Sequence, residues 1–383
     1  MNGSRSLISN YNPRALIGQP VEMLDTPSLV VDLDILESNI TNMAHNVSSH
    51  GVNLRPHIKT HKTPSIGKLQ LAAGATGITT AKLSEAWVFA DEGFDDILLA
   101  YQVVGKQKVM KLLELAKRVK LRTCVDNLKV AHTLSEAAIA AGTRIEVLLD
   151  IDTGLERTGC SPEEAEDLGT SIAKLDGLKL VGVFSFAGYR PGDPNPDVRK
   201  KWARNEAQTA VAVASDLQNK GIPAYTVSVS GTPGTPFAIE VDGVTEVRPG
   251  TYVFGDMNYA RLGVHSVDEC ALKVRSTIMS KPSQSRAVLD AGTKVLASDH
   301  PSILKNPVFG QIPMHLASQI TRVWEEHSVV ELDESDFSLQ VGDVVEVVPN
   351  HACVVTNLAN YWFGVRDGIV EEVNDIPARG LVE

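Results

Sequence analysis

The sequence predicts an α/β fold, a (β/α)8 barrel of the TIM type followed by a β domain. Three observations support this prediction. Short apolar runs alternate with amphipathic stretches from residue 28 onward, eight such units fit before residue 255, and no long helical pattern follows. Strict alternation of strand and helix indicates a parallel sheet with helical crossovers. No GxGxxG turn follows the first expected strand, which favours a closed barrel over an open doubly wound sheet.

The barrel strands are expected at eight apolar runs. These runs are SLVVDL (28–33), VNLRPHIK (52–59), GITTA (77–81), DILLAY (96–101), LRTCVD (121–126), IEVLLDID (145–152), LVGVFSF (180–186) and YTVSVSG (225–231). The stretches between them carry apolar residues three and four positions apart, as at Val109, Leu112, Leu113 and Ala116, which is the period of an amphipathic helix. A glycine follows most of these stretches, as is common where a helix ends.

Beyond residue 255 the pattern changes to β-rich segments separated by the turn sequences KPSQS, QVGD and RDG. The segments are ALKVRSTIMS (271–280), RAVLDAG (286–292), HSVVELD (327–333), DVVEVVPNHACVVTNL (343–358) and YWFGVRDGIVEEV (361–373). We therefore expect three parts. An N-terminal segment at 1–27 docks on the β domain, the barrel occupies 28–255, and the β domain occupies 256–383.

The composition argues against several classes of protein. The chain has 383 residues, with 36 Lys and Arg against 47 Asp and Glu, so its formal net charge is −11. This charge argues against a nucleic acid or an anionic membrane as the main partner. No apolar run approaches the roughly 18 residues of a membrane helix, and no signal-peptide pattern opens the sequence, so we expect a cytoplasmic protein. Four cysteines are too few for a disulfide framework in a chain of this length.

The second expected strand ends in RPHIKTHK, and barrels carry their working residues at the C-terminal ends of strands. This motif contains Arg55, His57, Lys59, His61 and Lys62. One interpretation of Lys59 is a desolvated amine of lowered pKa that forms a Schiff base. The other is a lysine that pairs with an anion or is exposed. His57 and His61 are expected to position the chain or a cofactor ring rather than to react.

Two glycine-containing turns follow the last expected strand. Loops in this position commonly bind phosphate in barrels, because glycine lets backbone N–H groups approach the oxygens. The first turn, SVSGTPGTP, offers Ser230, Gly231, Thr232 and Gly234. The second turn, RPGTY at 248–252, is a candidate to close over the same phosphate. Either turn alone is also compatible with an ordinary loop.

The sixth expected strand leads into GLERTG, which contains Arg157. An arginine at a strand end can hydrogen-bond a phenolate or a carboxylate in a pocket. It can equally pair with Asp150 and Asp152, which are close in sequence. The sequence leaves both interpretations open.

The motif PNHAC places His351 and Cys353 two residues apart in an expected strand, so that both side chains share one face. An imidazole and a thiolate form a zinc-type pair, and two protein ligands leave room for water or substrate, as in catalytic sites. The alternative is a buried histidine and a buried cysteine that meet by chance. His327, in WEEH, is a further candidate ligand or acid–base group.

Several of these motifs occur together in one known family. RPHIKTHK, GLERTG, SGTPGT, EVRPGTYVFGD and PNHAC resemble, in the same order, the D-threonine aldolase and D-serine dehydratase group of alanine-racemase-like enzymes. The resemblance extends from DTPSLVVDLD to the closing IPARG. It implies a barrel that binds pyridoxal 5′-phosphate (PLP), a C-terminal β domain, and a homodimer with active sites near the subunit interface.

The resemblance also implies roles for individual residues. Lys59 would carry PLP and act in catalysis, Arg157 would contact the phenolic oxygen of PLP, and Arg248 would lie near its pyridine nitrogen. The phosphate would be held by Ser230, Gly231, Thr232, Gly234, Gly250, Thr251 and Tyr252. His351 and Cys353 would bind a divalent metal, with Zn²⁺ expected first and Mn²⁺ or Mg²⁺ as alternatives. His351 would share in catalysis.

One position departs from the family pattern. The seventh expected strand leads into FSFAG, where relatives carry a Tyr or His at or beside the position of Phe186. Phe186 keeps an aromatic face, but it and the following Ala187 lack a polar contact. The substrate preference therefore stays open.

The resemblance implies a PLP- and metal-dependent lyase that acts on a small D-3-hydroxy-α-amino acid. Cleavage of the Cα–Cβ bond gives glycine and an aldehyde, whereas loss of the hydroxyl gives a 2-oxo acid and ammonia, as with D-serine or D-3-hydroxyaspartate. IMSKPSQSRAVLDAGTK and VRDGIVEEVNDIPARG look more like the aldolases, and PNHAC and FADEGFDDILLAY more like the dehydratases. Aldol cleavage is the preferred interpretation. A racemase would leave the metal pair unexplained, and a non-catalytic PLP carrier would resemble the barrel alone.

Overall fold

The computed structural model describes residues 12–189, 192–300 and 307–383. Residues 1–11 of the expected N-terminal segment lie outside this part. The chain divides into two compact units. Unit 1 comprises Met1–Ser38, Phe254–Asn258 and Ser266–Ile376, and unit 2 comprises Asn39–Val253, Tyr259–His265 and Pro377–Glu383. The chain passes between the units within α2 (Leu33–Ser49) and α10 (Met257–Arg261).

Within the described residues, unit 2 is built on eight parallel strands in the order β2-β9-β8-β7-β6-β5-β4-β3. The strands are β2 (Asn53–Leu54), β3 (Ile78–Thr80), β4 (Asp96–Leu99), β5 (Lys120–Val125), β6 (Ile145–Ile151), β7 (Leu178–Ser185), β8 (Thr226–Val229) and β9 (Glu246–Val247). A parallel bridge between His57 and Thr79 joins the two ends of this order. The sheet thereby closes into the barrel that the sequence predicts.

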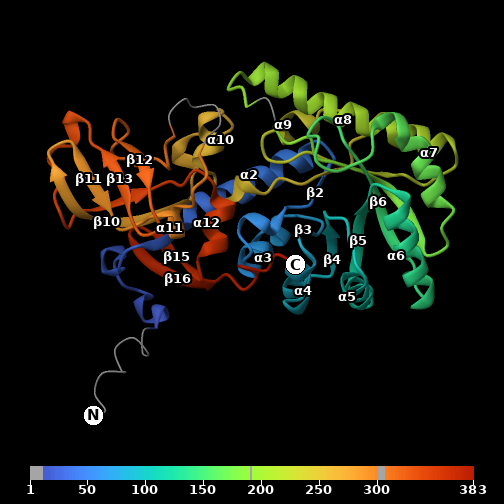
Figure 1. The fold of residues 1–383 in the computed structure, drawn as a ribbon, viewed down its shortest axis with the longest axis horizontal. Helices are drawn as coiled ribbons and strands as arrows, with labels where there is room; N and C mark the ends of the chain where they lie inside the picture. The colour runs from blue at the N-terminus through green and yellow to red at the C-terminus, as the bar shows by residue number, and fades with distance from the viewer. Residues whose placement is uncertain (1–11, 190–191, 301–306) are drawn as a thin grey trace, which may run out of the picture. The chain divides into compact units, whose positions relative to one another are not determined.

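Helices surround the parallel strands of unit 2 (Figure 1). They are α3 (Pro64–Ala72), α4 (Leu83–Asp91), α5 (Lys106–Ala116), α6 (Leu128–Ala140), α7 (Pro162–Ala173), α8 (Pro196–Asn219) and α9 (Thr235–Ala238). Helix α5 buries Val109, Leu112 and Leu113 in the same apolar cluster as the strand residues Ile97 and Leu149. Full burial of such a side chain contributes about 1.5–3 kcal/mol, so this apolar face holds the helix on the barrel.

Unit 1 contains a mixed sheet in the order β12-β13-β11-β10-β1-β15-β16, with β14 paired to β10. Its strands are β1 (Ser28–Asp32), β10 (Leu272–Ser283), β11 (Arg286–Leu289), β12 (Gln319–Val323), β13 (Ser328–Glu331), β14 (Val344–Val347), β15 (Tyr361–Arg366) and β16 (Ile369–Asp375). The short helices α11 (Thr293–Leu296) and α12 (Ala352–Leu358) lie between them in sequence. The separate β domain that the sequence predicts is therefore present.

The prediction that SLVVDL forms the first barrel strand is wrong. Ser28–Asp32 is β1 of unit 1, antiparallel to β10 and parallel to β15. The missing barrel strand is β9, Glu246–Val247, which is too short to stand out in the sequence. A short apolar run before a helix has the pattern of a β/α unit whichever sheet it joins, so periodicity does not distinguish the two. Unit 2 accordingly begins at residue 39 rather than 28, and 377–383 belong to it.

The described residues of the N-terminal segment pack on the sheet of unit 1. The N–H of Gly18 donates to the carbonyl of Val370 at 2.8 Å, and the N–H of Val21 to that of Gly368 at 2.8 Å. Val21 joins a buried cluster that includes Phe363. In the described part of the chain, no helix has both the length and the apolar character needed to cross a membrane.

Candidate active site

The C-terminal ends of three barrel strands bring Lys59, Arg157 and Phe186 together. Lys59 lies in a 3-10 turn (Ile58–Thr60) after β2, Arg157 follows β6, and Phe186 follows β7. Lys59 Nζ lies 5.8 Å from the centroid of the Phe186 ring, and the guanidinium carbon of Arg157 lies 5.4 Å from the same centroid. Two cations thus face one aromatic ring at the mouth of the barrel. Lys59 is at the expected strand end, although in a turn rather than in the strand.

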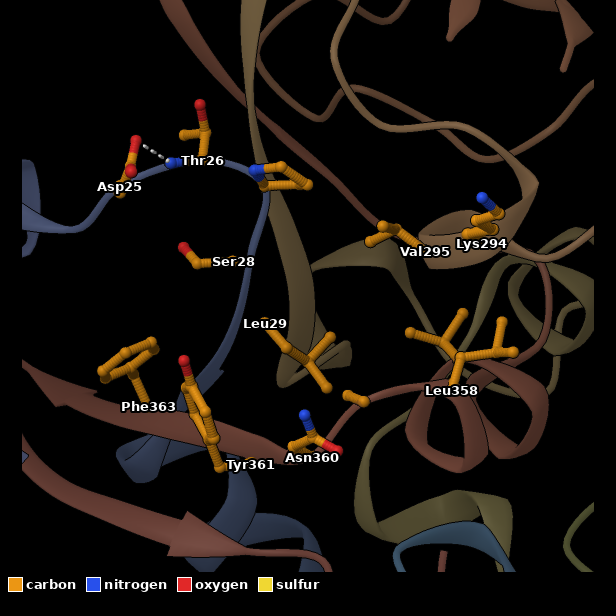
Figure 2. Close-up of a pocket in the computed structure, with 13 residues that line it drawn as sticks. Asp25, Thr26, Ser28, Leu29, Lys294, Val295, Leu358, Asn360, Tyr361 and Phe363 are labelled. Carbon is orange, nitrogen blue, oxygen red and sulfur yellow. Dashed lines mark hydrogen bonds between the residues drawn. The ribbon is translucent and has the colours of Figure 1, made fainter. Parts of the chain in front are cut away.

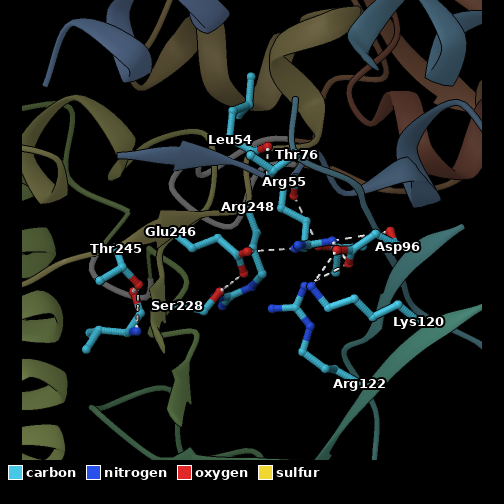
Figure 3. A network of polar contacts seen from close by, with 12 residues as sticks. Leu54, Arg55, Thr76, Asp96, Lys120, Arg122, Ser228, Thr245, Glu246 and Arg248 are labelled. Atoms are coloured by element: carbon cyan, nitrogen blue, oxygen red, sulfur yellow. Dashed lines mark hydrogen bonds and ion pairs between the residues drawn. The ribbon is translucent and has the colours of Figure 1, made fainter. Parts of the chain in front are cut away.

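Arg55 belongs to a buried ionic network inside the barrel (Figure 3). Its Nε donates to Glu246 Oε2 at 2.6 Å and its Nη1 to Asp96 Oδ1 at 2.7 Å. Arg122 donates to the same Asp96 oxygen at 2.7 Å. Burial acts to raise the pKa of Asp96, but Arg55 and Arg122 together hold it below its ordinary value. Loss of one member of such a buried pair costs about 3–5 kcal/mol, so Arg55 has a structural role.

Arg248 is joined to this network through Ser228. Ser228 Oγ donates to Glu246 Oε1 at 2.6 Å and accepts from Arg248 Nη1 at 2.6 Å. Arg248 Nη2 donates to the carbonyl of Ser185, and its guanidinium carbon lies 3.8 Å from the centroid of the Phe184 ring. Arg248 is only 3% exposed. Its guanidinium is therefore fixed inside the barrel.

The other residues of RPHIKTHK divide into two groups. His61 is fully buried with its Nδ1 3.1 Å from the N–H of Thr63, and Lys62 pairs with Glu85 at 3.0 Å, so both serve the fold. His57 is only half-buried and lies next to Lys59. Burial, followed by the charges of Lys59 and Arg248, lowers the pKa of His57 well below its ordinary value. The His57 imidazole is therefore neutral at physiological pH.

The two glycine-containing turns meet at Thr232. Its Oγ1 accepts from the N–H of Gly250 and from the N–H of Tyr252, each at 3.2 Å. Thr251 is buried between them. The Tyr252 hydroxyl instead accepts from Gln70 Nε2 of α3 at 2.9 Å, and burial raises its pKa. The convergent donors of the second turn are thus backbone N–H groups, while the tyrosine side chain is held by α3.

Both turns approach their neighbours too closely for a larger residue. A Cβ added at Gly231 would lie 2.9 Å from Phe186, and one added at Gly250 would lie 2.9 Å from the carbonyl oxygen of His57. Tightly packed glycine-containing turns near an aromatic ring and the cations Lys59 and Arg157 suit a phosphate-bearing ring. The residues present therefore fit PLP, with Lys59 beside the ring that they would enclose.

Ser230 and Gly234 bound the first turn. Ser230 adopts a φ of +64°, a left-handed backbone conformation that residues other than glycine rarely adopt. A Cβ added at Gly234 would collide with Ser230 Oγ. The turn is therefore tightly folded on itself.

The two aspartates near Arg157 have other partners. Asp150 Oδ2 accepts from Gln102 Nε2 at 2.6 Å, and burial raises the pKa of Asp150 to about 6. Asp152 Oδ1 accepts from the N–H groups of Gly154 and Glu156 at 2.9 and 3.1 Å. Since both carboxylates are engaged and Arg157 lies over Phe186, the geometry favours the pocket-facing interpretation of Arg157.

His351 and Cys353 lie in unit 1. They are not in a strand, although the sequence predicts one there. Strand β14 ends at Val347, and Pro349 precedes a turn into α12, for which His351 is the N-cap residue. His351 and Cys353 nevertheless hydrogen-bond. Burial lowers the pKa of His351, but Cys353 and Asp299 act in the opposite direction and raise it to about 10.

Asp299 fixes the imidazole from the other side. His351 Nδ1 lies 2.5 Å from Asp299 Oδ2, which leaves Nε2 for a metal. Asn350 Nδ2 donates to the carbonyl of Asp299 at 2.8 Å and to that of Val308 at 2.6 Å. A buried amide therefore holds the segment that carries the carboxylate against His351.

The donor set of this pair fits a divalent metal. Imidazole, thiolate and a supporting carboxylate are the groups of a zinc-type site. Among the described residues, no group of three or more His, Cys, Asp or Glu side chains is arranged to hold a metal ion. Water or substrate would complete the coordination, as in catalytic sites. His327 is exposed in the turn between β12 and β13, where its carbonyl accepts the Trp324 N–H at 2.8 Å.

Sequence reasoning missed Asp299. It is separated by 52 positions from His351 and lies in a loop without a recognisable motif. An Asp–His pair of this kind shows only once the chain is folded. The one available signal was the pairing rule that metal-binding histidines are usually oriented by a carboxylate.

A pocket of about 440 Å³ also lies in unit 1 (Figure 2). It is lined by Asp25, Thr26, Pro27, Ser28, Leu29, Lys294, Val295, Val355, Leu358, Ala359, Asn360, Tyr361 and Phe363. Its wall includes the later part of α12, whose first turn carries Cys353. None of the expected site residues lines it.

The chain is similar in sequence and fold to known proteins. Residues 31–258 match the family model of the alanine racemase N-terminal domain, and 271–365 match a putative serine dehydratase domain. D-threonine aldolase from Arthrobacter sp. is 35% identical over 96% of this chain and 96% of its own length. The crystal structure of D-threonine aldolase from Filomicrobium marinum has a TM-score of 0.89 at 33% identity, over 97% of this chain and 100% of that one.

A dehydratase is also similar. The metal-free form of a Cys-to-Ala variant of D-threo-3-hydroxyaspartate dehydratase has a TM-score of 0.87 at 29% identity, over 93% of this chain and 98% of that one. Both similarities span both units. The chain therefore belongs to the alanine-racemase-like family that contains the D-threonine aldolases and the D-serine dehydratases.

Proposed function

We propose that the protein is a PLP- and divalent-metal-dependent lyase that cleaves D-3-hydroxy-α-amino acids between Cα and Cβ, giving glycine and an aldehyde. The observation that carries the proposal is the convergence of Lys59 and Arg157 on Phe186. Gly231 of the first turn lies beside this ring, and Gly250 of the second turn lies beside His57. The nearly full-length similarity to a D-threonine aldolase favours aldol cleavage.

The residues of unit 2 divide the work of holding PLP. When bound, PLP delocalises the electrons of a bond at the substrate's α-carbon. Lys59 Nζ would hold the cofactor covalently, and Arg157 would contact its phenolic oxygen. Arg248, fixed on Phe184, would face the pyridine nitrogen. The phosphate would be bound by the two turns, which comprise Ser230, Gly231, Thr232, Gly234, Gly250, Thr251 and Tyr252. The N–H of Ser230, held by Glu206, and the hydroxyl of Tyr252, held by Gln70, would not take part.

The residues of unit 1 would hold the metal. A divalent cation, when bound, supplies a Lewis acid that lowers the pKa of a hydroxyl. His351 Nε2 and Cys353 Sγ would bind it, and Asp299 would orient the imidazole. These ligands suit Zn²⁺, with Mn²⁺ and Mg²⁺ as alternatives. A metal-free form has been described for a Cys-to-Ala variant of a relative, D-threo-3-hydroxyaspartate dehydratase, which supports metal dependence in this group of proteins.

The two reactions differ in which proton the protein moves. In aldol cleavage the β-hydroxyl loses its proton, the Cα–Cβ bond breaks and Cα gains a proton. In dehydration the Lys59 amine removes the Cα proton, and the hydroxyl takes up a proton and leaves as water. Hydrolysis then releases ammonia and the 2-oxo acid. His57, beside Lys59, is disfavoured as a proton acceptor in both reactions, because burial and the charges of Lys59 and Arg248 lower its pKa. Dehydration is the second candidate, because the His351–Cys353 pair lies within the match to a serine dehydratase domain.

The quaternary structure and location are part of the same proposal. Similarity to the family supports a homodimer. We also propose a cytoplasmic location, which is compatible with the acidic composition of the chain. Analytical ultracentrifugation of the purified protein measures the number of subunits directly.

Product analysis tests the proposed reaction. Purified protein is supplied with PLP and with Zn²⁺, Mn²⁺ or Mg²⁺, then incubated separately with D-threonine, D-serine and D-3-hydroxyaspartate. We expect one glycine and one acetaldehyde for each D-threonine consumed. Formation of 2-oxo acid and ammonia in their place would establish the dehydratase. No turnover of any substrate with any metal would refute a lyase and favour a PLP carrier.

A further inference from the structure

Side chains on one face of α8 hydrogen-bond to the backbone of three loops of unit 2. Arg199, Trp202 and Glu206 lie three and four positions apart, so their side chains share a face of the helix. Arg199 Nη1 donates to the carbonyl of Leu262 at 2.6 Å, and Trp202 Nε1 donates to that of Gly188 at 3.0 Å. Glu206 is the acidic member of this row. It accepts hydrogen bonds where the other two donate them.

A single oxygen of Glu206 connects two loops of the candidate active site. Oε1 accepts from the N–H of Ala187 and from the N–H of Ser230, each at 3.0 Å. Ala187 follows Phe186, and Ser230 opens the first glycine-containing turn. Glu206 therefore joins the loop that carries the aromatic ring to the turn proposed to bind phosphate.

The two loops also touch directly. The Phe186 ring approaches Gly231 so closely that an added Cβ would lie 2.9 Å from it. Ser230 meanwhile holds a left-handed φ of +64°, which a serine adopts only when its surroundings enforce it. Its N–H is held by Glu206 in this conformation. Movement of Ser230 would consequently disturb the turn and the ring together.

Burial of this carboxyl is unfavourable and needs an explanation. Glu206 is 2% exposed, and burial raises its pKa to about 7, although the N–H groups of Ala187 and Ser230 and the charge of Arg248 act to lower it. An apolar side chain at this position would fill the space without that penalty. It would leave two buried N–H groups without an acceptor.

We propose that Glu206 is a positioning residue for PLP, because its Oε1 holds the Phe186 loop and the phosphate-binding turn in a fixed relation. This inference rests on the proposed function. It adds a residue that does not touch the cofactor and that lies on α8, outside every motif of the sequence. The acceptor geometry of Glu206 matters for this role, whereas its charge does not.

Two conservative variants separate geometry from charge. Glu206→Gln keeps a carbonyl oxygen at the same reach and removes the charge. Glu206→Asp keeps the charge but shortens the side chain by one carbon, so that one oxygen no longer reaches both N–H groups. Gln208→Ala, at an exposed position of the same helix, is the matched control.

PLP affinity and the phosphorus-31 NMR signal of bound PLP are the readouts. For each full-length variant, PLP is removed and the apoprotein is titrated with PLP. We expect Glu206→Asp to weaken PLP binding by about tenfold, as for loss of one buried hydrogen bond, and to shift the phosphate signal. Glu206→Gln and Gln208→Ala should stay within about threefold of the unsubstituted protein.

Three results would overturn the inference. In the first, Glu206→Asp binds PLP with unchanged affinity and an unchanged phosphorus signal. In the second, Glu206→Gln is weaker than Glu206→Asp, which would assign the effect to charge. In the third, Glu206→Asp lowers the thermal stability of the apoprotein without changing its PLP affinity, which would make the role purely structural. Failure of the unsubstituted protein to bind PLP would instead refute the proposed function and the inference with it.

Discussion

The proposed PLP site of unit 2 and the proposed metal site of unit 1 are built in opposite ways. In unit 2, two turns joined by hydrogen bonds to Thr232 and the cations Lys59, Arg157 and Arg248 lie at the ends of barrel strands. In unit 1, Asp299 orients one imidazole beside one thiol at the beginning of a short helix. The first arrangement suits an anionic phosphate and the second a cation. The difference teaches that the protein residues proposed for each site belong to a single unit. Each site should therefore be removable by mutation without loss of the other.

The largest effect is expected from Lys59→Ala. Without this amine, the covalent bond to PLP is lost and turnover should fall by at least about a thousandfold, because no other group replaces a covalent catalyst. Metal content should be unchanged, since His351 and Cys353 lie in the other unit. Visible absorbance of the bound cofactor and elemental analysis of the same sample measure both quantities. Joint loss of PLP and metal would show that the PLP site and the metal site are not independent.

Cys353→Ala is the reverse experiment. Removal of the thiolate should abolish metal binding and lower turnover by about a hundredfold or more, while the PLP absorbance stays unchanged. Treatment of the unsubstituted protein with a chelator should reproduce this result, and added Zn²⁺, Mn²⁺ or Mg²⁺ should restore activity. Full turnover in the presence of the chelator would argue against any role of the metal.

A smaller effect is expected from Asp299→Asn. The amide cannot provide the charge that orients His351 and increases its basicity, so metal affinity should fall by about 10–100-fold without a change in PLP binding. Competition with a metal-sensitive dye measures the affinity. Asp367→Asn, at an exposed turn of the same unit, is the control. Equal metal affinity of both variants would remove Asp299 from the site.

The last expected effect concerns the free energy of unfolding and its dependence on pH, rather than turnover or binding. Burial raises the pKa of Glu206 to about 7, whereas an unfolded glutamate titrates near about 4.3. Between these values the folded chain binds more protons than the unfolded chain, so the contribution of Glu206 to the free energy of unfolding falls as pH rises and is constant above about 7. Glu206→Gln should therefore match the unsubstituted protein near pH 4 and exceed it by on the order of 3–4 kcal/mol at pH 8. Urea denaturation at several pH values checks this, and a difference that does not vary with pH would contradict it.

Local patterns predicted much of the fold. Seven of the eight expected strands lie in the barrel, because an apolar run followed by an amphipathic helix is a local signal. The same signal misassigned Ser28–Asp32, whose partners β10 and β15 are distant in sequence. It also missed Glu246–Val247, since two residues carry no periodicity.

For the site, too, local motifs were predicted from the sequence, whereas contacts between residues distant in sequence were not. Lys59, Arg157 and the two turns were predicted because strand ends in a barrel share one face, and Lys59 and Arg157 do lie near one ring. His351 and Cys353 were predicted as a pair of metal-binding residue types, and their role stays a prediction, although Pro349 and the cap of α12 replace the expected strand. Asp299 and Glu206 could not be found, because their partners are 52 and 24 positions away and only the folded chain brings them together.

The covalent attachment of PLP to Lys59 is tested most directly by reducing the holoprotein with borohydride and mapping its peptides by mass spectrometry. The proposed function predicts one modified peptide, with the added mass of reduced PLP on Lys59. Modification of Lys62 or Lys82 in its place, or no modified peptide in a protein that has bound PLP, would contradict it.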